Sequence, residues 1–322
     1  WEDFAGPHAR PLLERYRDQL LTFNDDIQGT AAVVFGAATG AIKVSGKSFR
    51  EQQIVFYGAG AAAIGVADYL RMALVDSGLS EEEARSRFWI VNRGGILHTE
   101  RADLSAEQRV YAQPVERLRE WKRPSSGVID FETTIRNVDA TILIGLSTLG
   151  GAFRESIVRE MARKVERPII FPLSNPTDRC EAVPEDLLRW TGGRAIVATG
   201  SPFAPVEFAG RKIPIAQCNN VYVFPAVGLG LIASGARRVT DRMMMAAGRA
   251  LGENSPAVTD PTASLLSALK DLPAMARQIA FEVGVEAQRA GAAPAMSSQE
   301  LRNRIAATQW TPEYPHLIRA NS

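Results

Sequence analysis

The chain has 322 residues, enough for one large domain or two of medium size. Its 37 basic and 36 acidic residues nearly balance, so net charge indicates neither a nucleic-acid nor a membrane partner. Two isolated cysteines, Cys180 and Cys218, and three scattered histidines argue against a zinc site, and the low cysteine count favours a reducing, cytoplasmic compartment.

The chain opens on Trp1-Glu2-Asp3-Phe4, without an initiator methionine or a signal peptide. This abrupt start suggests that an upstream part of the protein lies outside the sequence. A helix is expected over 7–21, from apolar residues at helical spacing and a proline near its start. No apolar run reaches the length of a membrane span.

Two adjacent carboxylates, Asp25 and Asp26, directly precede an expected helix over 28–45. Together with Glu2 and Asp3 they offer three or four carboxylates to one site. Such an oxygen-rich set is what Mg²⁺ or Mn²⁺ prefers. For Asp25 and Asp26 alone, the simpler interpretation is a helix N-cap with a neighbour that suits the helix dipole.

Short apolar runs then alternate with helices. Strands are expected over 53–57, 87–92, 140–145, 168–172 and 195–199. Helices are expected over 60–76, 113–121, 131–136, 154–163 and 183–190. This alternation predicts a doubly wound, Rossmann-like α/β fold, in which helices cover both faces of a parallel sheet and the ligand lies at the carboxyl ends of the strands.

After residue 220 the pattern becomes helical, and this tail is expected to pack beside the start of the chain. Its helices are expected over 223–235, 237–251, 261–268, 273–290 and 297–307. We therefore divide the chain into the end of an upstream domain that holds substrate and metal (1–27), an NAD(P)-binding domain (28–219) and a helical carboxyl-terminal segment (220–322).

A glycine turn, Gly58-x-Gly60-x-x-Ala63, joins the first expected strand to its helix. The first glycine permits a tight turn, the second lets the backbone approach a pyrophosphate, and the small third residue lets the helix close on the strand. The helix N-terminus then stabilises the phosphate charge. The pattern alone is weak, but its place between a strand and a helix favours dinucleotide binding.

The second strand ends at Asn92, where an acid usually bonds the adenosine ribose of NAD. Asparagine still bonds a hydroxyl but does not repel a phosphate, and Arg93 offers to attract one. Arg93 is equally explained as a solvated loop residue. The sequence therefore predicts that NADP is accepted at least comparably with NAD.

Two later loops and the start of the tail carry further candidates. Gly145 and Ser147 follow the third strand and are expected beside the cofactor. Asn175 follows the fourth strand, and Asn219 and Asn220 open the helical tail. Such amides hold a substrate carboxylate or a nicotinamide carboxamide, although turn chemistry explains each one alone.

Five motifs, in order along essentially the whole chain, resemble the malic enzyme family. They are Glu2-Asp3-Phe4, Phe23-Asn24-Asp25-Asp26-Ile27-Gln28-Gly29-Thr30, Gly58-Ala59-Gly60, Ser174-Asn175-Pro176-Thr177 and Asn219-Asn220-Val221-Tyr222-x-Phe224-Pro225. The resemblance implies oxidative decarboxylation of L-malate to pyruvate and CO₂ with NAD or NADP and Mn²⁺ or Mg²⁺. The segment 92–111 and the end at 310–314 look bacterial.

The resemblance also implies roles for individual residues. They are metal binding for Glu2, Asp3 and Asp26, an active-site acid that pairs with the catalytic lysine for Asp25, malate contacts for Asn175 and Asn219 or Asn220, and cofactor contacts for Gly58, Gly60, Ala63 and Asn175. The family's catalytic tyrosine and lysine and its malate-binding arginine lie upstream of this sequence. We therefore expect the carboxyl-terminal portion of a homo-oligomeric enzyme, a dimer or tetramer, with little activity alone.

Three alternatives stay open. Malolactic enzyme shares the motifs but releases lactate. An amino-acid dehydrogenase shares the fold of the second domain but lacks a carboxylate metal cluster. A non-catalytic NAD(P)-binding module would need neither metal nor substrate.

Overall fold

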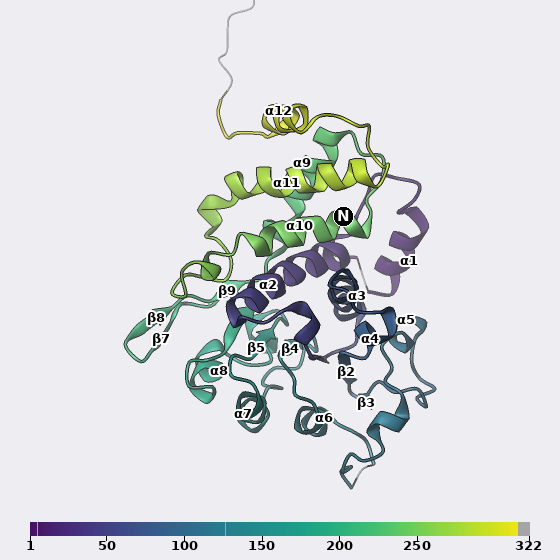
Figure 1. The fold of residues 1–322 in the computed structure, drawn as a ribbon, viewed down its shortest axis with the longest axis vertical. Helices are drawn as coiled ribbons and strands as arrows, with labels where there is room; N and C mark the ends of the chain where they lie inside the picture. Colours follow the sequence, from purple (N-terminus) through teal and green to yellow (C-terminus); the bar gives the residue numbers. More distant parts are fainter. Residues whose placement is uncertain (5, 126, 315–322) are drawn as a thin grey trace, which may run out of the picture.

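The computed structural model describes residues 1–4, 6–125 and 127–314, and a twisted sheet lies at its centre (Figure 1). The strands are β1 (Ile54–Tyr57), β2 (Phe88–Asn92), β3 (Gly95–Ile96), β4 (Ile142–Gly145), β5 (Ile169–Pro172), β6 (Ile196–Thr199), β7 (Val206–Phe208), β8 (Arg211–Ile213) and β9 (Ala216–Gln217). Seven of them form one sheet in the order β3-β2-β1-β4-β5-β6-β9, and β7 and β8 form a separate hairpin.

All neighbouring strands of the large sheet run parallel except β3, which is antiparallel to β2. The chain leaves β1 for β2 on one side and later returns to β4 on the other. The strand order therefore reverses between β1 and β4, which is where a doubly wound fold binds its ligand. The predicted α/β fold class is confirmed.

Helices cover both faces of the sheet. They are α1 (Gly6–Tyr16), α2 (Thr30–Ser45), α3 (Ala61–Asp76), α4 (Glu81–Arg85), α5 (Ala106–Arg109), α6 (Phe131–Asn137), α7 (Glu155–Lys164), α8 (Pro184–Trp190), α9 (Phe224–Ser234), α10 (Asp241–Glu253), α11 (Leu272–Arg289) and α12 (Ser298–Thr308). Figure 1 shows α6, α7 and α8 on one side of the sheet, and α2, α10, α11 and α12 stacked in that order on the other.

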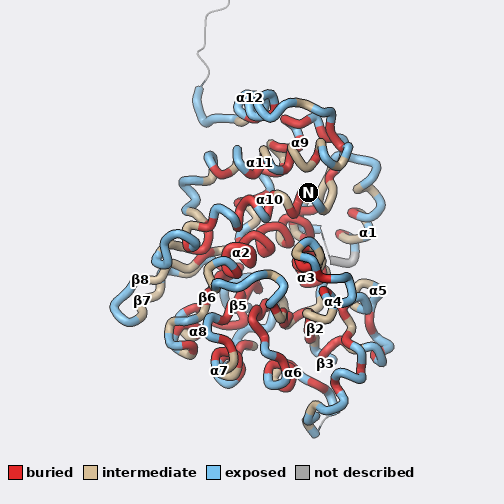
Figure 2. Tube along the Cα trace, in the orientation of Figure 1, coloured by how far each residue is buried: buried red, intermediate tan, exposed pale blue. Residues whose placement is uncertain are grey.

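Alternation along each strand divides the core between these two sides. Ile54 and Phe56 of β1 pack with α2, α3 and the helical tail, whereas Val55 packs with α6, α7 and α8. This is the period-two pattern of a strand buried on both faces. Helix α2 is buried along nearly its whole length because the sheet covers one side and α10 the other (Figure 2).

The burial of α2 bears on the question of whether a helix of this chain could cross a membrane. Together with the π-helical turn η1 (Asp25–Gly29), α2 forms a helix of 21 residues, Asp25–Ser45, which is long and apolar enough to cross a membrane. It qualifies by length and composition only and includes Asp25, Asp26 and Lys43, so the expectation about uninterrupted apolar runs stands. Most of this helix is buried inside the fold, as in the core helix of a soluble protein.

The structure also corrects three expected helices. The helix over 7–21 ends at Tyr16, where Gln19 and Leu20 N–H groups close a turn onto its carbonyl. The helix over 113–121 is only a 3₁₀ turn at Val115–Leu118. No helix forms over 261–268, because the Asp260 carboxylate accepts the Thr262 N–H and favours a turn.

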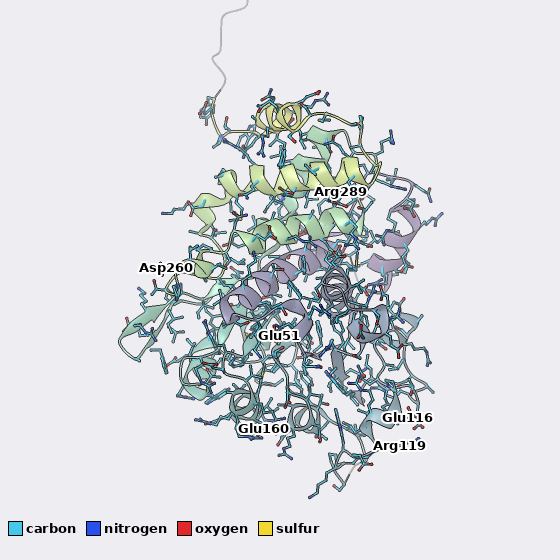
Figure 3. All side chains as sticks on the ribbon, viewed as in Figure 1. Glu51, Glu116, Arg119, Glu160, Asp260 and Arg289 are labelled. Carbon is cyan, nitrogen blue, oxygen red and sulfur yellow. The ribbon has the colours of Figure 1, made fainter. Side chains whose placement is uncertain are left out.

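Charged side chains gather on the outside of the molecule. Glu116 and Arg119 illustrate this: they pair at 3.3 Å at the periphery, far from α2, and both side chains are largely exposed (Figure 3). Such pairs stabilise a fold little.

Candidate active site

The glycine turn lies at the carboxyl end of β1. Gly58 has φ 119°, and a Cβ placed there would lie 2.3 Å from the carbonyl oxygen of Leu146, so the turn requires glycine and presses against the loop after β4. Gly60 caps α3, and a Cβ placed there meets no atom within 4 Å. This open space above a helix N-terminus fits a pyrophosphate. Ala63 is buried in the core, where its small size permits close helix packing.

At the end of β2, the hydrogen bonds of Asn92 add a detail that the sequence did not predict. The side-chain oxygen of Asn92 accepts hydrogen bonds from the Gly94 N–H and from Arg101, both at 2.9 Å. Its amide nitrogen, a donor, is therefore what it can present to a ribose or a phosphate. Arg101 is buried and pairs with Asp103 at 2.5 Å, whereas Arg93 is exposed.

Two nearby residues stabilise the loops at this end of the sheet through hydrogen bonds to backbone carbonyls. Arg109 donates to the carbonyl of Ala102 at 3.1 Å, and Gln108 donates to the carbonyl of Ala59 in the glycine turn at 2.9 Å. Sequence reasoning missed Arg101. Its position nine residues beyond Asn92 carries no local pattern that connects the two.

An acidic cavity lies beside the glycine turn, at the same edge of the sheet. Its volume is about 310 Å³, and its lining comes from η1, from the loops after β4, β5 and β6, and from the start of the helical tail. The lining residues are Glu2, Asp25, Asp26, Thr30, Val34, Leu146, Leu173, Asn175, Gly200, Cys218, Asn219, Asn220 and Phe224. Leu146 belongs both to this lining and to the loop against Gly58, so the two features adjoin.

Asp25 is the most deeply buried acid of this cavity. Burial raises its pKa, the hydrogen bond from Asn220 lowers it, and the charges of Glu2 and Asp26 raise it further. Its Oδ2 accepts from Asn220 at 3.0 Å, while its Oδ1 is buried without a hydrogen-bond partner in the described structure. A buried carboxylate oxygen in this state is costly, so it calls for a proton or a cation as partner.

The first residues of the chain lie along the acidic segment. The carbonyl of Trp1 accepts the Asp25 N–H at 2.9 Å, and the Asp3 N–H donates to Oδ2 of Asp26 at 2.8 Å. The cavity thus receives the carboxylates of Glu2, Asp25 and Asp26, but not that of Asp3. Asp3 has φ 61° and contributes its backbone N–H.

The predicted grouping of Glu2, Asp3 and Asp26 is therefore not assembled. Among residues 1–4, 6–125 and 127–314, no three histidine, cysteine, aspartate or glutamate side chains are placed to hold a metal ion. The chemistry of the cavity still suits a hard cation, since the carboxylate residues Glu2, Asp25 and Asp26 line it. The metal site stays a prediction.

The three asparagines all line this cavity but differ in which side-chain atoms remain available to bind a ligand. Asn220 donates to Asp25 and to Thr30, so it orients the acid. The Asn219 oxygen caps the following turn by accepting the Val221 N–H at 2.9 Å. The Asn175 oxygen accepts from Ser201 at 2.7 Å, which leaves its amide nitrogen for a ligand.

Cys218, which sequence reasoning assigned no role, also lines the cavity. Burial raises its pKa to about 12, so the free thiol is neutral at physiological pH. The ionisable lining that is charged at neutral pH therefore comes from carboxylates. The described lining holds no lysine, arginine, histidine or tyrosine.

Comparison with known proteins identifies the family of this fold and site. Residues 27–288 match the family model described as malic enzyme, NAD binding domain. Two curated relatives, the NAD-dependent malic enzymes of Edwardsiella ictaluri (strain 93-146) and Sodalis glossinidius (strain morsitans), are 49% and 48% identical over 314 residues. Each match covers 98% of this chain and 55% of the relative, so the chain spans about half the length of these relatives.

Solved structures agree. The malic enzyme of Entamoeba histolytica superposes with a TM-score of 0.75 at 25% identity, over 95% of this chain and 58% of the other. The malic enzyme of Pyrococcus horikoshii Ot3 superposes with a TM-score of 0.73 at 25% identity, over 95% of this chain and 65% of the other.

Proposed function

The chain belongs to the malic enzyme family, and from this we propose that it supplies the NAD site and a divalent-metal site for oxidative decarboxylation of L-malate to pyruvate and CO₂. The observation that carries the proposal is the meeting of two features at one sheet edge. An open helix N-terminus at Gly60 adjoins a cavity lined by three carboxylates. Hydride transfer requires the hydride acceptor and the alcohol substrate to lie this close together.

The residues of the chain have distinct tasks in this proposal. The turn at Gly58 and Gly60 admits the pyrophosphate, and the N-terminus of α3 stabilises its charge. The amides of Asn175 and Asn219 hold the substrate carboxylates or the nicotinamide. Asn220 fixes the orientation of Asp25, the acid that we propose pairs with the catalytic lysine of the upstream part.

The carboxylates are proposed to hold Mn²⁺ or Mg²⁺. Glu2 and Asp26 would bind the cation, and Asp3 would join them only if its side chain turned toward the cavity. When bound, the cation supplies Lewis acidity to the hydroxyl and carboxylate of malate. The reaction balances: malate and NAD⁺ give pyruvate, CO₂ and NADH without net proton release.

The cavity needs a complement from elsewhere in the enzyme. Malate carries two negative charges, and the described lining offers acids and amides but no cationic side chain. We therefore propose that the 322-residue chain alone turns over little or no malate. General acid–base groups contribute about 10²–10⁴-fold each, so malate-dependent NAD reduction by the chain at the rate of an intact enzyme would contradict this.

Metal binding tests the acid cavity directly. Titration of Mn²⁺ into the chain, followed by electron paramagnetic resonance, should show one site that Asp26→Asn weakens by about tenfold or more, since a lost charged contact is worth about 1.5–3 kcal/mol. Asp178→Asn, an exposed aspartate outside the cavity lining, is the matched control. Equal Mn²⁺ binding by both variants would show that Asp26 is no ligand.

Cofactor preference forms a separate part of the proposal. The relatives are named NAD-dependent, yet Asn92 presents a donor where an acid would repel phosphate. We expect the intact enzyme to accept NADP comparably with NAD, and Asn92→Asp to shift the ratio of catalytic efficiencies toward NAD by about tenfold. An unchanged ratio would show that position 92 does not contact the ribose.

Product analysis separates the remaining alternatives. Pyruvate identifies a malic enzyme and lactate a malolactic enzyme. Binding of NAD without any metal requirement or turnover, in a protein that includes the upstream part, would favour a non-catalytic module. We further propose a cytoplasmic homo-oligomer, with malate as the small-molecule partner.

A further inference from the structure

The side chain of Glu181 is wholly buried, with 0% of its surface exposed. It belongs to the loop that follows β5 and reaches the loop that follows β4. Its Oε1 accepts hydrogen bonds from the Ser147 N–H at 2.9 Å, the Ser147 hydroxyl at 2.8 Å and the Ser174 hydroxyl at 2.5 Å. Its Oε2 accepts the Ser174 N–H at 3.2 Å. One buried carboxylate thus joins both loops.

The surrounding backbone is shaped around this carboxylate. A Cβ placed at Gly145 would lie 2.5 Å from Cδ of Glu181, so β4 ends in glycine because the glutamate occupies that space. Thr148 has φ 57°, which is rare for threonine, and its N–H donates to the Ser174 hydroxyl at 2.8 Å. Such a conformation persists only where its surroundings hold it.

Both loops border the site. The first presses Leu146 against Gly58 of the glycine turn, and the second carries Asn175 into the acid cavity. Glu181 itself lines neither feature. Its four hydrogen bonds, two of them from backbone N–H groups, are of the charge-assisted kind that fixes geometry most strongly.

We propose that Glu181 is a positioning residue, which sets the loops after β4 and β5 in the arrangement that binds the dinucleotide. The proposal rests on the proposed function, because it takes this sheet edge to be the NAD site. A purely structural role would be different: loss of the carboxylate would then lower stability without changing the affinity for NAD.

The test measures NAD dissociation constants by calorimetric titration of the chain, well below the thermal midpoint of every variant. Glu181→Gln keeps the volume of the side chain but turns one oxygen into a donor, which opposes the donors of Ser147 or Ser174. We expect NAD binding to weaken by about tenfold or more. The backbone bonds from Gly151 and Phe153 to residues 180 and 181 remain and support the fold.

Thr191→Val is the matched control. Thr191 is 2% exposed and donates to the Leu187 carbonyl at 2.7 Å, just before the amino end of β6, at the opposite edge of the sheet. Its loss also removes a buried hydrogen bond, but NAD affinity should stay unchanged. Equal weakening by Thr191→Val and Glu181→Gln at comparable thermal midpoints would overturn the proposal.

Milder variants keep the proposal testable if Glu181→Gln does not fold. Ser147→Ala and Ser174→Ala each remove one hydroxyl and leave the carboxylate, so each should weaken NAD binding severalfold. Unchanged affinity in both would overturn the positioning role. If the unsubstituted chain binds no NAD, both the proposed function and the positioning role are wrong. If it binds NAD and Glu181→Gln binds NAD equally well, only the positioning role is wrong.

Discussion

Asp68 on α3 is a half-buried acid outside the candidate site, and its carboxylate accepts a hydrogen bond from the Tyr111 hydroxyl at 2.6 Å. Burial raises the pKa of Asp68, although the Tyr111 hydrogen bond and the charges of Arg71 and Arg10 oppose the rise. The folded state therefore holds this proton more tightly than the unfolded state. The stability that results is present below pH about 4 and is lost as pH rises through the elevated pKa.

Asp68→Asn should therefore change the pH dependence of stability. Asparagine keeps an acceptor for Tyr111 but never ionises. We expect the variant to have a higher thermal midpoint than the unsubstituted chain at pH 7, with the difference shrinking toward pH 4. Thermal unfolding of both proteins across this range, followed by circular dichroism, measures the effect.

Asp103 serves as a control of opposite sign. Its hydrogen bond from Arg101 lowers its pKa, so its contribution to stability is present above pH about 4 and lost as pH falls through the lowered pKa. Asp103→Asn should slightly lower the midpoint at pH 7, because an exposed pair is screened. A midpoint difference for Asp68→Asn that does not vary with pH would contradict the assignment.

Individual site residues were predictable where a local motif carries them. The glycine turn and the adjacent acids Asp25 and Asp26 stand together in sequence, and the structure places them at one edge. Glu181 and Arg101 were not predictable. Each acts on residues distant along the chain, Ser147 and Asn92, through side-chain contacts that only the folded sheet brings together.

Helices α2 and α10 pack so closely at their glycines that no side chain fits at these positions. A Cβ placed at Gly248 would lie 2.4 Å from the carbonyl oxygen of Ala32, and one placed at Gly252 would lie 2.3 Å from that of Gly36. Small residues on both helices therefore let the tail approach α2, which carries the acidic segment at its start. The position of the cavity depends on this contact.

Gly248→Ala should destabilise the chain by about 1–3 kcal/mol, the usual cost of overpacking a core. Gly228→Ala on α9 is the control, since a Cβ there meets nothing within 4 Å. It should leave stability unchanged or raise it by about 0.5–1 kcal/mol, because alanine favours a helix more than glycine does. Urea unfolding compares them, and equal stability losses would contradict the close α2–α10 contact.

Strands and long helices were predictable from their patterns, because β1, β2, β4, β5 and β6 are short apolar runs between helices. The small edge strands β3 and β9 and the hairpin β7–β8 were missed. Two or three residues carry too little periodicity to mark a strand, and only neighbouring strands define these pairings. The π-helical turn η1 was also missed, although it begins at the predicted N-cap region and carries both site acids.

On the scale of the whole molecule, the fold brings the start of the chain, the centre of the sheet and the helical tail to one edge. The acids come from 2–26, the turn from 58–60 and the asparagines from 175–220. The predicted division at residues 27 and 219 stays a prediction, since one hydrophobic core joins α2, the sheet and the tail. A dinucleotide site in this arrangement is the central claim.

Calorimetric titration of NAD into the unsubstituted chain and into Gly60→Ala tests this claim most directly. The methyl group of alanine meets no protein atom within 4 Å, so the variant should keep its thermal midpoint while the methyl occupies the space of the pyrophosphate. The account predicts saturable NAD binding by the unsubstituted chain and at least about tenfold weaker binding by Gly60→Ala. Absence of NAD binding by the unsubstituted chain, or equal affinity in the two proteins, would contradict it.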